Sequence, residues 1–578
     1  MKESMLTAQS RSHALAEMAD GAGLDILVVG GGVTGAGIAL DAVTRGLRTG
    51  LVEMQDWAAG TSSRSSRLVH GGLRYLYQLD LHLVSEALAE RGLLLDTIAP
   101  HLVHAQPFLW PLRIPLVERG YSALGIGLYD LIARFQGGHV PIQRHYDKAG
   151  ALGIFPDIRP GRLTGAIRFY DARVDDARLV VDLVRTAVSY GALAASRTRV
   201  VDFVRQRGAV TGAVLHDLEA DREITVRARH VINATGVWTE QTEGLAGPQA
   251  QGLKVLASKG VHIVVPKERI RGRTGLFLRT EKSVLFIIPW PDHWVIGTTD
   301  TTWTEQPETP VATAADIDYI LDQANAVLRS RLTRDDILAS YAGLRPLLQP
   351  LQAAPGESAK VSREHTVARV APGLSAIAGG KLTTYRRMAE DAVDFALGDE
   401  RARVQPSITR RIQLVGAVGY EATRAQAGPV ARRMGWDRRR TEHLLSRYGS
   451  ELTVIADLVR AAPDLGRPLA AAPGYLRAEV VYAVTHEGAL HLSDVLERRV
   501  RLAVEQRDGG CATLDEIGEL VAPLLGWDDA TLDREKASYR RAVEARRAAA
   551  EAPDDATAAR IIAESLGTGA GTGAATGA

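Results

Sequence analysis

The stretch that most constrains the fold of this chain runs from Asp25 to Glu53. Ile26 to Val29 is a short apolar run, typical of a buried parallel strand, and it ends at a G-x-G-x-x-G motif. The first glycine of such a motif permits a tight turn, the second lets a diphosphate approach the backbone, and the third lets helix and strand pack closely. The three glycines are Gly30, Gly32 and Gly35. The stretch therefore predicts a strand, turn and helix that place a diphosphate at the helix N-terminus.

The acidic residue that ends this stretch supports the same interpretation. Glu53 follows Gly35 by 18 positions, at the expected end of the second strand. A carboxylate in that place accepts hydrogen bonds from both ribose hydroxyls and repels a 2′-phosphate. The motif thus favours FAD or NAD over NADP. An ordinary strand–helix–strand unit without a nucleotide is the alternative, and the completeness of the pattern disfavours it.

The composition indicates a soluble globular protein of several domain-sized units. The chain has 578 residues, of which 46% are hydrophobic and 24% are charged. Because the net charge is only +1, we expect no nucleic-acid partner. The single cysteine, Cys511, excludes an intrachain disulfide and is typical of a reducing compartment. No run of 18 uninterrupted apolar residues occurs, and the N-terminus lacks the apolar core of a secretory signal, so we expect neither a transmembrane helix nor a leader.

Two patterns that would imply other chemistry do not meet their requirements. The dipeptide Gly380-Lys381 invites a P-loop interpretation, but Ser375 stands where that motif needs its first glycine, and Leu382 follows the lysine. The pattern H-E-x-x-x-H at 486–491 is one residue too long to place two zinc ligands on one helix face. We therefore predict neither a kinase nor a metal site.

After Glu53 the chain enters a loop, Ala58 to Tyr77, that is rich in hydroxyl groups, glycine and arginine. Its part TSSRSSRLVHGGLRYL resembles the loop of the FAD-dependent glycerol-3-phosphate dehydrogenases, the quinone-linked enzymes of aerobic bacteria and mitochondria. The resemblance continues in family order over most of residues 25 to 400. The further matching blocks are LVSEALAER (83–91), VDDARLV (174–180), NATGVW (233–238), KGVHIVVP (259–266), IPW and IGTTD (288–300), YAGLRPL (341–347) and GGKLTTYR (379–386). Arg64 departs from the family pattern, in which a small residue is commoner, so the role of its side chain stays open.

The resemblance implies an α/β fold with a doubly wound, Rossmann-like FAD-binding domain and an interleaved antiparallel substrate-binding domain. We expect this unit over residues 24–398, with substrate-binding parts at about 100–160 and 238–345. The helical pattern that starts near Gln405 predicts an all-α C-terminal domain over 399–565. Residues 1–23 are interpreted as a flexible arm. Residues 566–578 are interpreted as a disordered tail, because Gly567 to Ala578 contains only Gly, Thr and Ala.

Functional residues follow from the resemblance at the matching positions. Contacts to FAD are expected from Gly30, Gly32, Gly35, Glu53, Thr61, Ser62, Ser63, Ser66, Gly71, Gly72, Ala234, Thr235, Gly236, Gly380, Lys381, Leu382 and Thr383. The substrate is expected to contact Arg74, Tyr75, Arg345 and Lys381, because two arginine forks can grip one phosphate. His262 is the expected catalytic base, with His70 as the competing candidate, and Arg345 is expected to take part in catalysis.

The reaction implied by the resemblance is oxidation of sn-glycerol 3-phosphate to dihydroxyacetone phosphate. Hydride would pass from C2 to flavin N5, and the electrons would pass to a membrane quinone. Two alternatives stay open: an oxygen-using glycerol-3-phosphate oxidase, and a non-catalytic flavoprotein scaffold that presents its arginine-rich C-terminal domain to a partner. Formation of a homodimer also stays open.

We expect a cytoplasmic protein that is attached peripherally to the inner face of the cell membrane. One candidate for lipid contact is the basic cluster at 432–433 and 438–440, although a solvated helix face is the preferred interpretation. The other is Leu124 to Phe135, which predicts an apolar helical stripe. This stripe could equally be core or lie in a bilayer interface.

Overall fold

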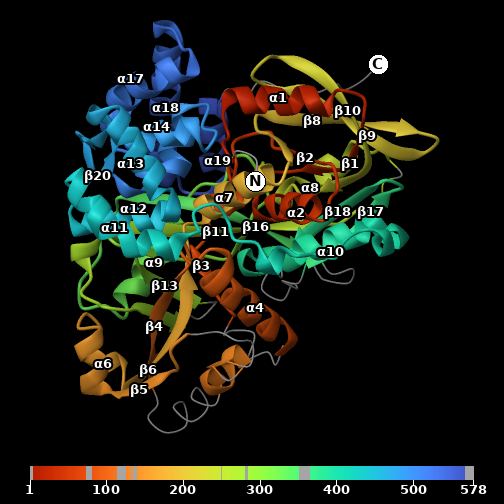
Figure 1. Ribbon diagram of the computed structural model, residues 1–578. Coiled ribbons are helices and arrows are strands. Elements are labelled where there is room, and N and C mark those ends of the chain that lie inside the picture. Colours follow the sequence, from red (N-terminus) through yellow and green to blue (C-terminus); the bar gives the residue numbers. More distant parts are fainter. Residues whose placement is uncertain are drawn as a thin grey trace.

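The computed structural model describes residues 4–72, 81–113, 125–130, 132–134, 140–248, 250, 252–279, 284–349 and 365–566. The described chain forms two large mixed β-sheets and a region of helices contributed by its C-terminal part (Figure 1). Arg74, Tyr75 and the predicted tail from residue 567 onward lie outside the described residues.

The first sheet is the core of a doubly wound α/β domain. Its strand order is β17-β18-β10-β1-β2-β7, and the four neighbouring pairs from β18 to β7 are parallel. The strands are β1 (Leu24–Val29), β2 (Thr49–Val52), β7 (Leu193–Ala195), β10 (Arg222–Asn233), β17 (His365–Ala371) and β18 (Leu374–Gly379). The antiparallel strands β8 (Thr198–Gln206) and β9 (Ala209–Asp217) extend β10 into a second layer. The predicted fold class is therefore confirmed.

Both faces of strand β1 are covered, which explains its unbroken apolar sequence. Ile26 and Val28 point to a core shared with helices α2 (Val33–Thr44), α7 (Asp176–Ser189) and α10 (Tyr385–Leu397). Leu27 and Val29 point the other way, to a core shared with helix α1 and strands β8 and β9. The alternation of successive side chains thus places one strand between two layers.

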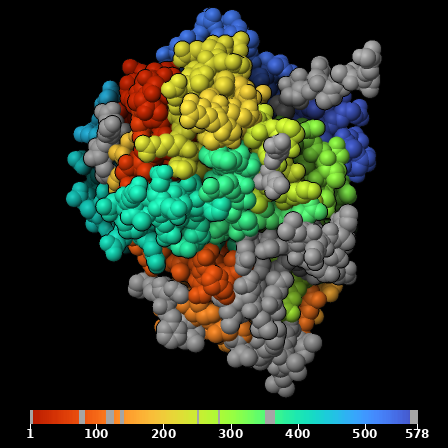
Figure 2. Space-filling view, turned by 90° about the vertical axis from the view of Figure 1, so that its right-hand side faces the viewer, coloured from red at the N-terminus to blue at the C-terminus, as the bar shows by residue number. Residues whose placement is uncertain are grey.

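Helix α1 (Ala8–Met18) forms within the segment that was expected to be a flexible arm. Thr7 caps its N-terminus by a capping box with Ser10. Leu15 and Met18 are buried, and Arg11 forms a buried ion pair with Asp217. Figure 2 shows α1 (red) beside the yellow strands of the β8–β10 layer on the molecular surface. Tertiary packing orders this helix, although its own sequence is only weakly amphipathic.

The second sheet is mainly antiparallel and is assembled from separated parts of the chain. Its order is β15-β11-β14-β13-β12-β4-β6-β3, with β16 also paired to β11 and β5 to β6. The strands are β3 (Leu68–Val69), β4 (His104–Leu112), β5 (Arg144–Asp147), β6 (Gly165–Arg173), β11 (Val255–Pro266), β12 (Gly275–Arg279), β13 (Val284–Pro289), β14 (His293–Gly297), β15 (Thr301–Thr302) and β16 (Ala339–Leu348). Helix α9 (Ala314–Asn325) packs against it. This arrangement interleaves the second sheet with the first along the sequence.

The C-terminal region is helical and contains one short β-ribbon. Its main helices are α11 (Tyr420–Met434), α12 (Arg438–Tyr448), α13 (Leu452–Ala461), α14 (Arg477–Thr485), α17 (Leu514–Leu525), α18 (Asp529–Ala550) and α19 (Asp555–Leu566), and the ribbon is β19 (Pro468–Leu469) with β20 (Ala472–Leu476). Buried ion pairs join this region to the rest of the molecule. These pairs are Arg499 with Asp56, Arg178 with Glu487, Arg447 with Asp175, and Arg501 with Asp176.

None of the helices in the described ranges combines the length and the apolar character needed to cross a bilayer.

Candidate cofactor and substrate site

A cavity of about 1050 Å³ opens beside the ends of strands β1, β2, β10 and β18. Its volume is at the upper end of the range for small-molecule and cofactor sites. The walls come from the motif after β1, the loop at 59–64, the segments that follow β10 and β18, and the C-terminal helices. Ligands of open α/β sheets bind in this position, outside the carboxyl ends of the parallel strands.

The three motif glycines are needed for different reasons: two by the packing of the backbone and one by the space of the cavity. A Cβ atom at Gly30, whose φ is +112°, would lie 2.6 Å from the carbonyl oxygen of Ala234. A Cβ at Gly35 would lie 1.8 Å from the carbonyl oxygen of Gly30. A Cβ at Gly32 would meet only the Ser62 hydroxyl, at 3.2 Å. Gly30 and Gly35 are therefore required by the fold itself, whereas Gly32 keeps space free on the cavity wall.

The N-terminus of helix α2 faces the cavity without a capping side chain from its own N-cap residue, which is Gly32. The backbone N–H of Val33 donates to Ser62 Oγ at 3.0 Å, so the loop after β2 lies against this helix end. Ser62 and Ser63 belong to the short helix η1 (Thr61–Ser63), which lines the cavity. The positive end of the helix dipole and these hydroxyl groups form a cradle suited to a diphosphate.

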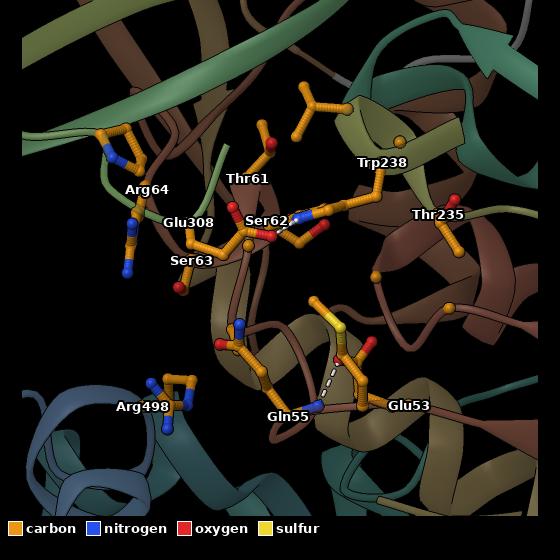
Figure 3. A pocket seen from close by; sticks show the side chains of 18 of the residues that line it. Glu53, Gln55, Thr61, Ser62, Ser63, Arg64, Thr235, Trp238, Glu308 and Arg498 are labelled. Atoms are coloured by element: carbon orange, nitrogen blue, oxygen red, sulfur yellow. Dashed lines mark hydrogen bonds between the residues drawn. The ribbon is translucent and has the colours of Figure 1, made fainter. Parts of the chain in front are cut away.

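Glu53 lies at the end of β2, and two backbone N–H groups hold its carboxylate on the cavity wall. Gly31 N–H donates to Oε2 at 2.6 Å and Gln55 N–H donates to Oε1 at 2.7 Å, the second of which is visible in Figure 3. Burial raises the pKa of Glu53, while the hydrogen bonds from Gln55 and Gly31 oppose the shift. Each oxygen keeps a lone pair for a ribose hydroxyl. The cradle and this carboxylate together fit a dinucleotide.

The segments after β10 and β18 complete the wall around this cradle. Ala234, Thr235, Gly236, Gly380, Lys381 and Leu382 all line the cavity. Trp238 Nε1 donates to Glu308 at 2.7 Å and closes one side (Figure 3). Thr61 also lines the cavity, but its hydroxyl is used by the protein, since it donates to the Leu344 carbonyl at 2.6 Å.

Several residues that were predicted to contact the cofactor lie behind this wall. The hydroxyl of Thr383 accepts the N–H of His70 at 3.1 Å and lies 3.2 Å from its carbonyl oxygen, so it ties the loop after β3 to the start of α10. Gly71 is buried against Leu88 and Tyr129. Gly35, Ser66 and Gly72 also fall outside the cavity lining, as do the two candidates for the catalytic base, His70 and His262. Contacts of Gly35, Ser66, Gly71, Gly72 and Thr383 with a cofactor stay predictions.

His262 lies on β11, opposite Tyr341 on β16, and its side chain is buried. Its Nε2 lies 2.8 Å from Ser66 Oγ, while Nδ1 is buried with no hydrogen-bond partner among the described residues. The imidazole stacks on the Tyr341 ring at 5.0 Å, and Tyr341 lines the cavity. Burial, with the positive charges of Arg345 and Arg67, lowers the pKa of His262 to about 3. The imidazole is therefore neutral at physiological pH.

Arg345 lies on β16 opposite Ser258 of β11, which is four positions from His262 along that strand and on the same face of the sheet. Its Nη2 donates to Thr298 Oγ1 at 2.9 Å and to the Thr299 carbonyl at 3.2 Å, and its Nη1 lies 3.4 Å from Asp300 Oδ1. The segment 298–300 therefore orients the guanidinium beside the buried histidine. The structure brings these two predicted residues together, and it does not describe Arg74 or Tyr75.

The C-terminal region also contributes to the cavity, which the sequence did not suggest. Its lining residues include His491, Ser493, Glu497, Arg498, Arg501, Glu535, Tyr539 and Arg546. Figure 3 shows Arg498 on this opposite side, facing the loop that carries Ser63 and Arg64. No local sequence pattern predicts that these residues line the cavity, because the contacts that place them join segments more than 400 residues apart. The hydrogen bond between Asp56 and Arg498 is one example.

The basic cluster and the apolar stripe, the two candidates for lipid contact, differ in how their side chains are placed. Arg438 and Arg439 are exposed and pair with Glu442 and Asp292, respectively, which is the arrangement of a solvated helix face. Leu128 is 37% exposed, whereas Tyr129 next to it is fully buried. Other positions of the apolar stripe, among them Leu124, Leu131 and Phe135, lie outside the described residues.

Comparison with known proteins supports the interpretation of both regions. Residues 25–386 match the family described as FAD dependent oxidoreductase, and residues 407–532 match the C-terminal domain of alpha-glycerophosphate oxidase. The chain is 50% identical over 537 residues to glycerol-3-phosphate dehydrogenase 2 of Mycobacterium tuberculosis, covering 92% of this chain and 90% of that protein. It is 36% identical over 547 residues to the human mitochondrial glycerol-3-phosphate dehydrogenase, covering 90% and 73%.

A solved structure shares this fold over most of the chain. The glycerol-3-phosphate dehydrogenase of Bacillus halodurans, complexed with FAD, superimposes with a TM-score of 0.76 at 30% identity. The match covers 93% of this chain and 98% of that one.

Proposed function

The chain belongs to the family of FAD-dependent glycerol-3-phosphate dehydrogenases, and from that premise we propose that it oxidises sn-glycerol 3-phosphate to dihydroxyacetone phosphate. Its cofactor is FAD, and the cavity with its glycine cradle, helix terminus and carboxylate fits this group. When bound, the flavin supplies the acceptor for the hydride that leaves C2. The remaining tasks fall to side chains of this protein.

The observation that carries the proposal is the placement of His262 and Arg345 on neighbouring strands beside the cavity. A phosphate dianion needs fixed, charged donors, and the orientation of Arg345 is set by Thr298, Thr299 and Asp300. A hydroxyl at C2 needs a proton acceptor, and a neutral imidazole can serve. The two residues thus supply the two functions that oxidation of a phosphorylated secondary alcohol requires.

The low pKa of His262 sets a condition on this role. A base with a pKa of about 3 takes a proton from an alcohol with difficulty. Part of the shift comes from the cations Arg345 and Arg67, and a bound phosphate dianion would offset their charge. In this proposal the substrate that Arg345 binds also makes His262 more basic. His70, the second candidate for the base, lies in the loop that Thr383 holds.

An anaerobic titration of the purified holoprotein with sn-glycerol 3-phosphate tests the activity. We expect bleaching of the flavin absorbance band by the phosphorylated substrate. His262→Ala should slow this reduction by about 100-fold or more while FAD stays bound. Near-normal reduction in that variant would assign the base to His70 or another group. Absence of bleaching in the unmodified protein would reject the dehydrogenase activity and favour the scaffold role.

We further propose that the electrons pass to a quinone of the membrane and that the protein attaches to the cytoplasmic face peripherally. The names of the relatives, which are dehydrogenases, support an acceptor other than oxygen. The C-terminal match to a glycerophosphate oxidase domain keeps the oxidase as the second candidate. Reoxidation of the reduced protein by air and by a soluble quinone, followed by stopped-flow absorbance, separates the two. Fast reoxidation by air alone would favour the oxidase.

Fractionation of cell membranes tests the attachment. High salt or alkaline washing should release the protein, because peripheral binding combines screened charge attraction with limited apolar burial. Retention through both washes until detergent is added would contradict peripheral binding.

A further inference from the structure

Arg64 lies in the loop after β2, and its side chain lines the cofactor cavity. It directly follows the short helix η1 (Thr61–Ser63), whose Ser62 hydroxyl accepts the first N–H of helix α2. Figure 3 shows its side chain extending past Ser63 toward the wall that carries Arg498. Arg64 therefore adds a positive charge to a cavity whose phosphate-binding parts are already built.

The arginines of the C-terminal wall differ from Arg64 because each has a carboxylate partner. Arg498 pairs with Asp56, Arg501 with Asp176, and Arg546 with Glu497. The Arg64 guanidinium forms no hydrogen bond or ion pair with any part of the chain that the structure describes.

The surroundings of Arg64 do not compensate its charge within the protein. Glu497 is the carboxylate whose charge acts on Arg64, but it already accepts hydrogen bonds from Arg498 and Arg546. Burial lowers the pKa of Arg64 to about 10; Glu497 opposes this shift, and the positive charges of Arg546 and Arg498 add to it. The guanidinium is therefore available to an anion that enters the cavity from outside the chain.

The ligand of this cavity carries such an anion. FAD has one charged group, its diphosphate, and the end of helix α2 directs that group to the same cradle beside Ser62. Arginine is suited to it, because the planar guanidinium donates two parallel hydrogen bonds to phosphate oxygens. We propose that Arg64 is a cofactor-binding residue of this chain and that its guanidinium pairs with the diphosphate of FAD. The proposal rests on the FAD cofactor and is independent of which substrate is oxidised.

Binding of ligands to the deflavinated protein tests the proposal without any measurement of activity. The ligands are FAD, ADP and adenosine, and calorimetry gives each dissociation constant. Arg64→Gln should weaken FAD and ADP binding by about 10-fold or more, because charge-assisted hydrogen bonds are lost. Adenosine binding should change by less than about twofold, because adenosine lacks the diphosphate.

Arg199→Gln is the matched control. Arg199 also lines the cavity, but its side chain is exposed, so the same loss of one charge is screened by water. We expect this variant to change ADP affinity by less than about threefold. Equal losses of ADP affinity in the two variants would show a general charge effect and would overturn the specific pairing.

Two further outcomes would overturn the proposal. One is unchanged ADP affinity in an Arg64→Gln variant whose circular dichroism and melting temperature match those of the unmodified protein. The other is a parallel loss of ADP and adenosine affinity, which would mean that the substitution distorts the cavity. If the Gln variant does not fold, Arg64→Lys replaces it, since lysine keeps the charge and loses the fork. That variant should bind ADP about threefold or more weakly with adenosine unchanged, and unchanged ADP affinity there rejects the pairing.

Discussion

Ser66 Oγ lies 2.8 Å from Nε2 of His262, and this contact joins the loop after β2 to strand β11 of the second sheet. The histidine side chain is buried and neutral, and its Nδ1 has no hydrogen-bond partner in the described chain. Among the described residues, Ser66 is the hydrogen-bond partner through which the protein can orient this imidazole, which also stacks on the Tyr341 ring. The loop that forms one wall of the cofactor cavity also positions the proposed base.

The first prediction concerns the pH dependence of the proposed reaction. The pKa of His262 is about 3 because of burial and the nearby Arg345 and Arg67, so the free protein holds this group deprotonated from pH 5 upward. The pH profile of kcat/KM should therefore show no inflection from His262 between pH 5 and 8. Stopped-flow flavin reduction across this range checks it. An inflection near pH 6.5 that disappears in His262→Asn would contradict the assigned state.

The second prediction separates glycines needed by the cofactor from glycines needed by the fold. Gly32→Ala adds a Cβ that meets only the Ser62 hydroxyl, so the protein should fold and lose FAD. Gly35→Ala, the matched control, forces a Cβ into the Gly30 carbonyl and should prevent stable folding. The flavin absorbance of purified protein and a melting curve distinguish the two. A yellow, fully loaded Gly32→Ala variant would show that the diphosphate does not use this surface.

The third prediction concerns a histidine that joins two parts of the molecule. His491 Nε2 lies 3.0 Å from Glu219 in the turn after β9, and Nδ1 lies 2.8 Å from Glu535 on α18. Burial disfavours the charged imidazole, but the hydrogen bonds to Glu219 and Glu535 outweigh it and raise the pKa to about 10. Because the folded-state pKa lies above the ordinary value of 6.5, this contribution to stability is complete below pH 6.5 and is lost as the pH rises through 10.

His491→Gln should therefore lower the free energy of unfolding at pH 6 by about 1 kcal/mol or more, a figure already discounted for partial exposure. The melting temperature at pH 6 should fall with it. The difference from the unmodified protein should shrink steadily toward pH 10. Because His491 lines the cofactor cavity, FAD should also dissociate more readily at low pH from the variant. A pH-independent difference in melting temperature would mean that the side chain acts by packing and not by its charge.

The comparison of sequence and structure shows which interactions local patterns reveal. The turn at Gly30 and the position of Glu53 at the end of β2 depend on residues close together in the chain, and both formed as predicted. The start of α7, capped by Asp175, depends on a local pattern of the same kind. The C-terminal wall of the cavity depends on buried pairs such as Asp56 with Arg499, which are separated by 443 positions. Such pairs leave no periodic signal, because each partner alone resembles an ordinary surface charge.

Burial of side chains was predictable for some aromatic residues and not for others. Trp294 and Trp303 are buried, with exposed fractions of 0% and 4%, which is usual for aromatic side chains in strand-rich segments. Trp290 is only partly buried, and the guanidinium groups of Arg67 and Arg173 each lie about 5 Å from its ring. The aromatic side chain that follows β13 thus makes cation–π contacts with two arginines, and alternation along a strand does not predict such contacts.

The last prediction concerns phosphate recognition by Arg345. The segment 298–300 fixes its guanidinium through Thr298 Oγ1, the Thr299 carbonyl and Asp300. A lysine would keep the charge but could not hold this segment and a phosphate through one planar fork. Loss of one fork at a phosphate costs about 2 to 5 kcal/mol of transition-state stabilisation, so Arg345→Lys should lower kcat/KM for glycerol 3-phosphate by at least about 30-fold.

Arg269→Lys is the matched control for this substitution, because Arg269 pairs with Asp336 through hydrogen bonds and lies on a short helix away from the cavity lining. It should leave kcat/KM unchanged. Turnover of unphosphorylated glycerol, which lacks the group that Arg345 would bind, should hardly change in either variant. If Arg345 only braces the segment 298–300, then both substrates would suffer alike and the melting temperature would fall with them. Measurement of kcat/KM on both substrates, together with a melting curve, decides between these roles, since a parallel loss would reject Arg345 as a phosphate ligand.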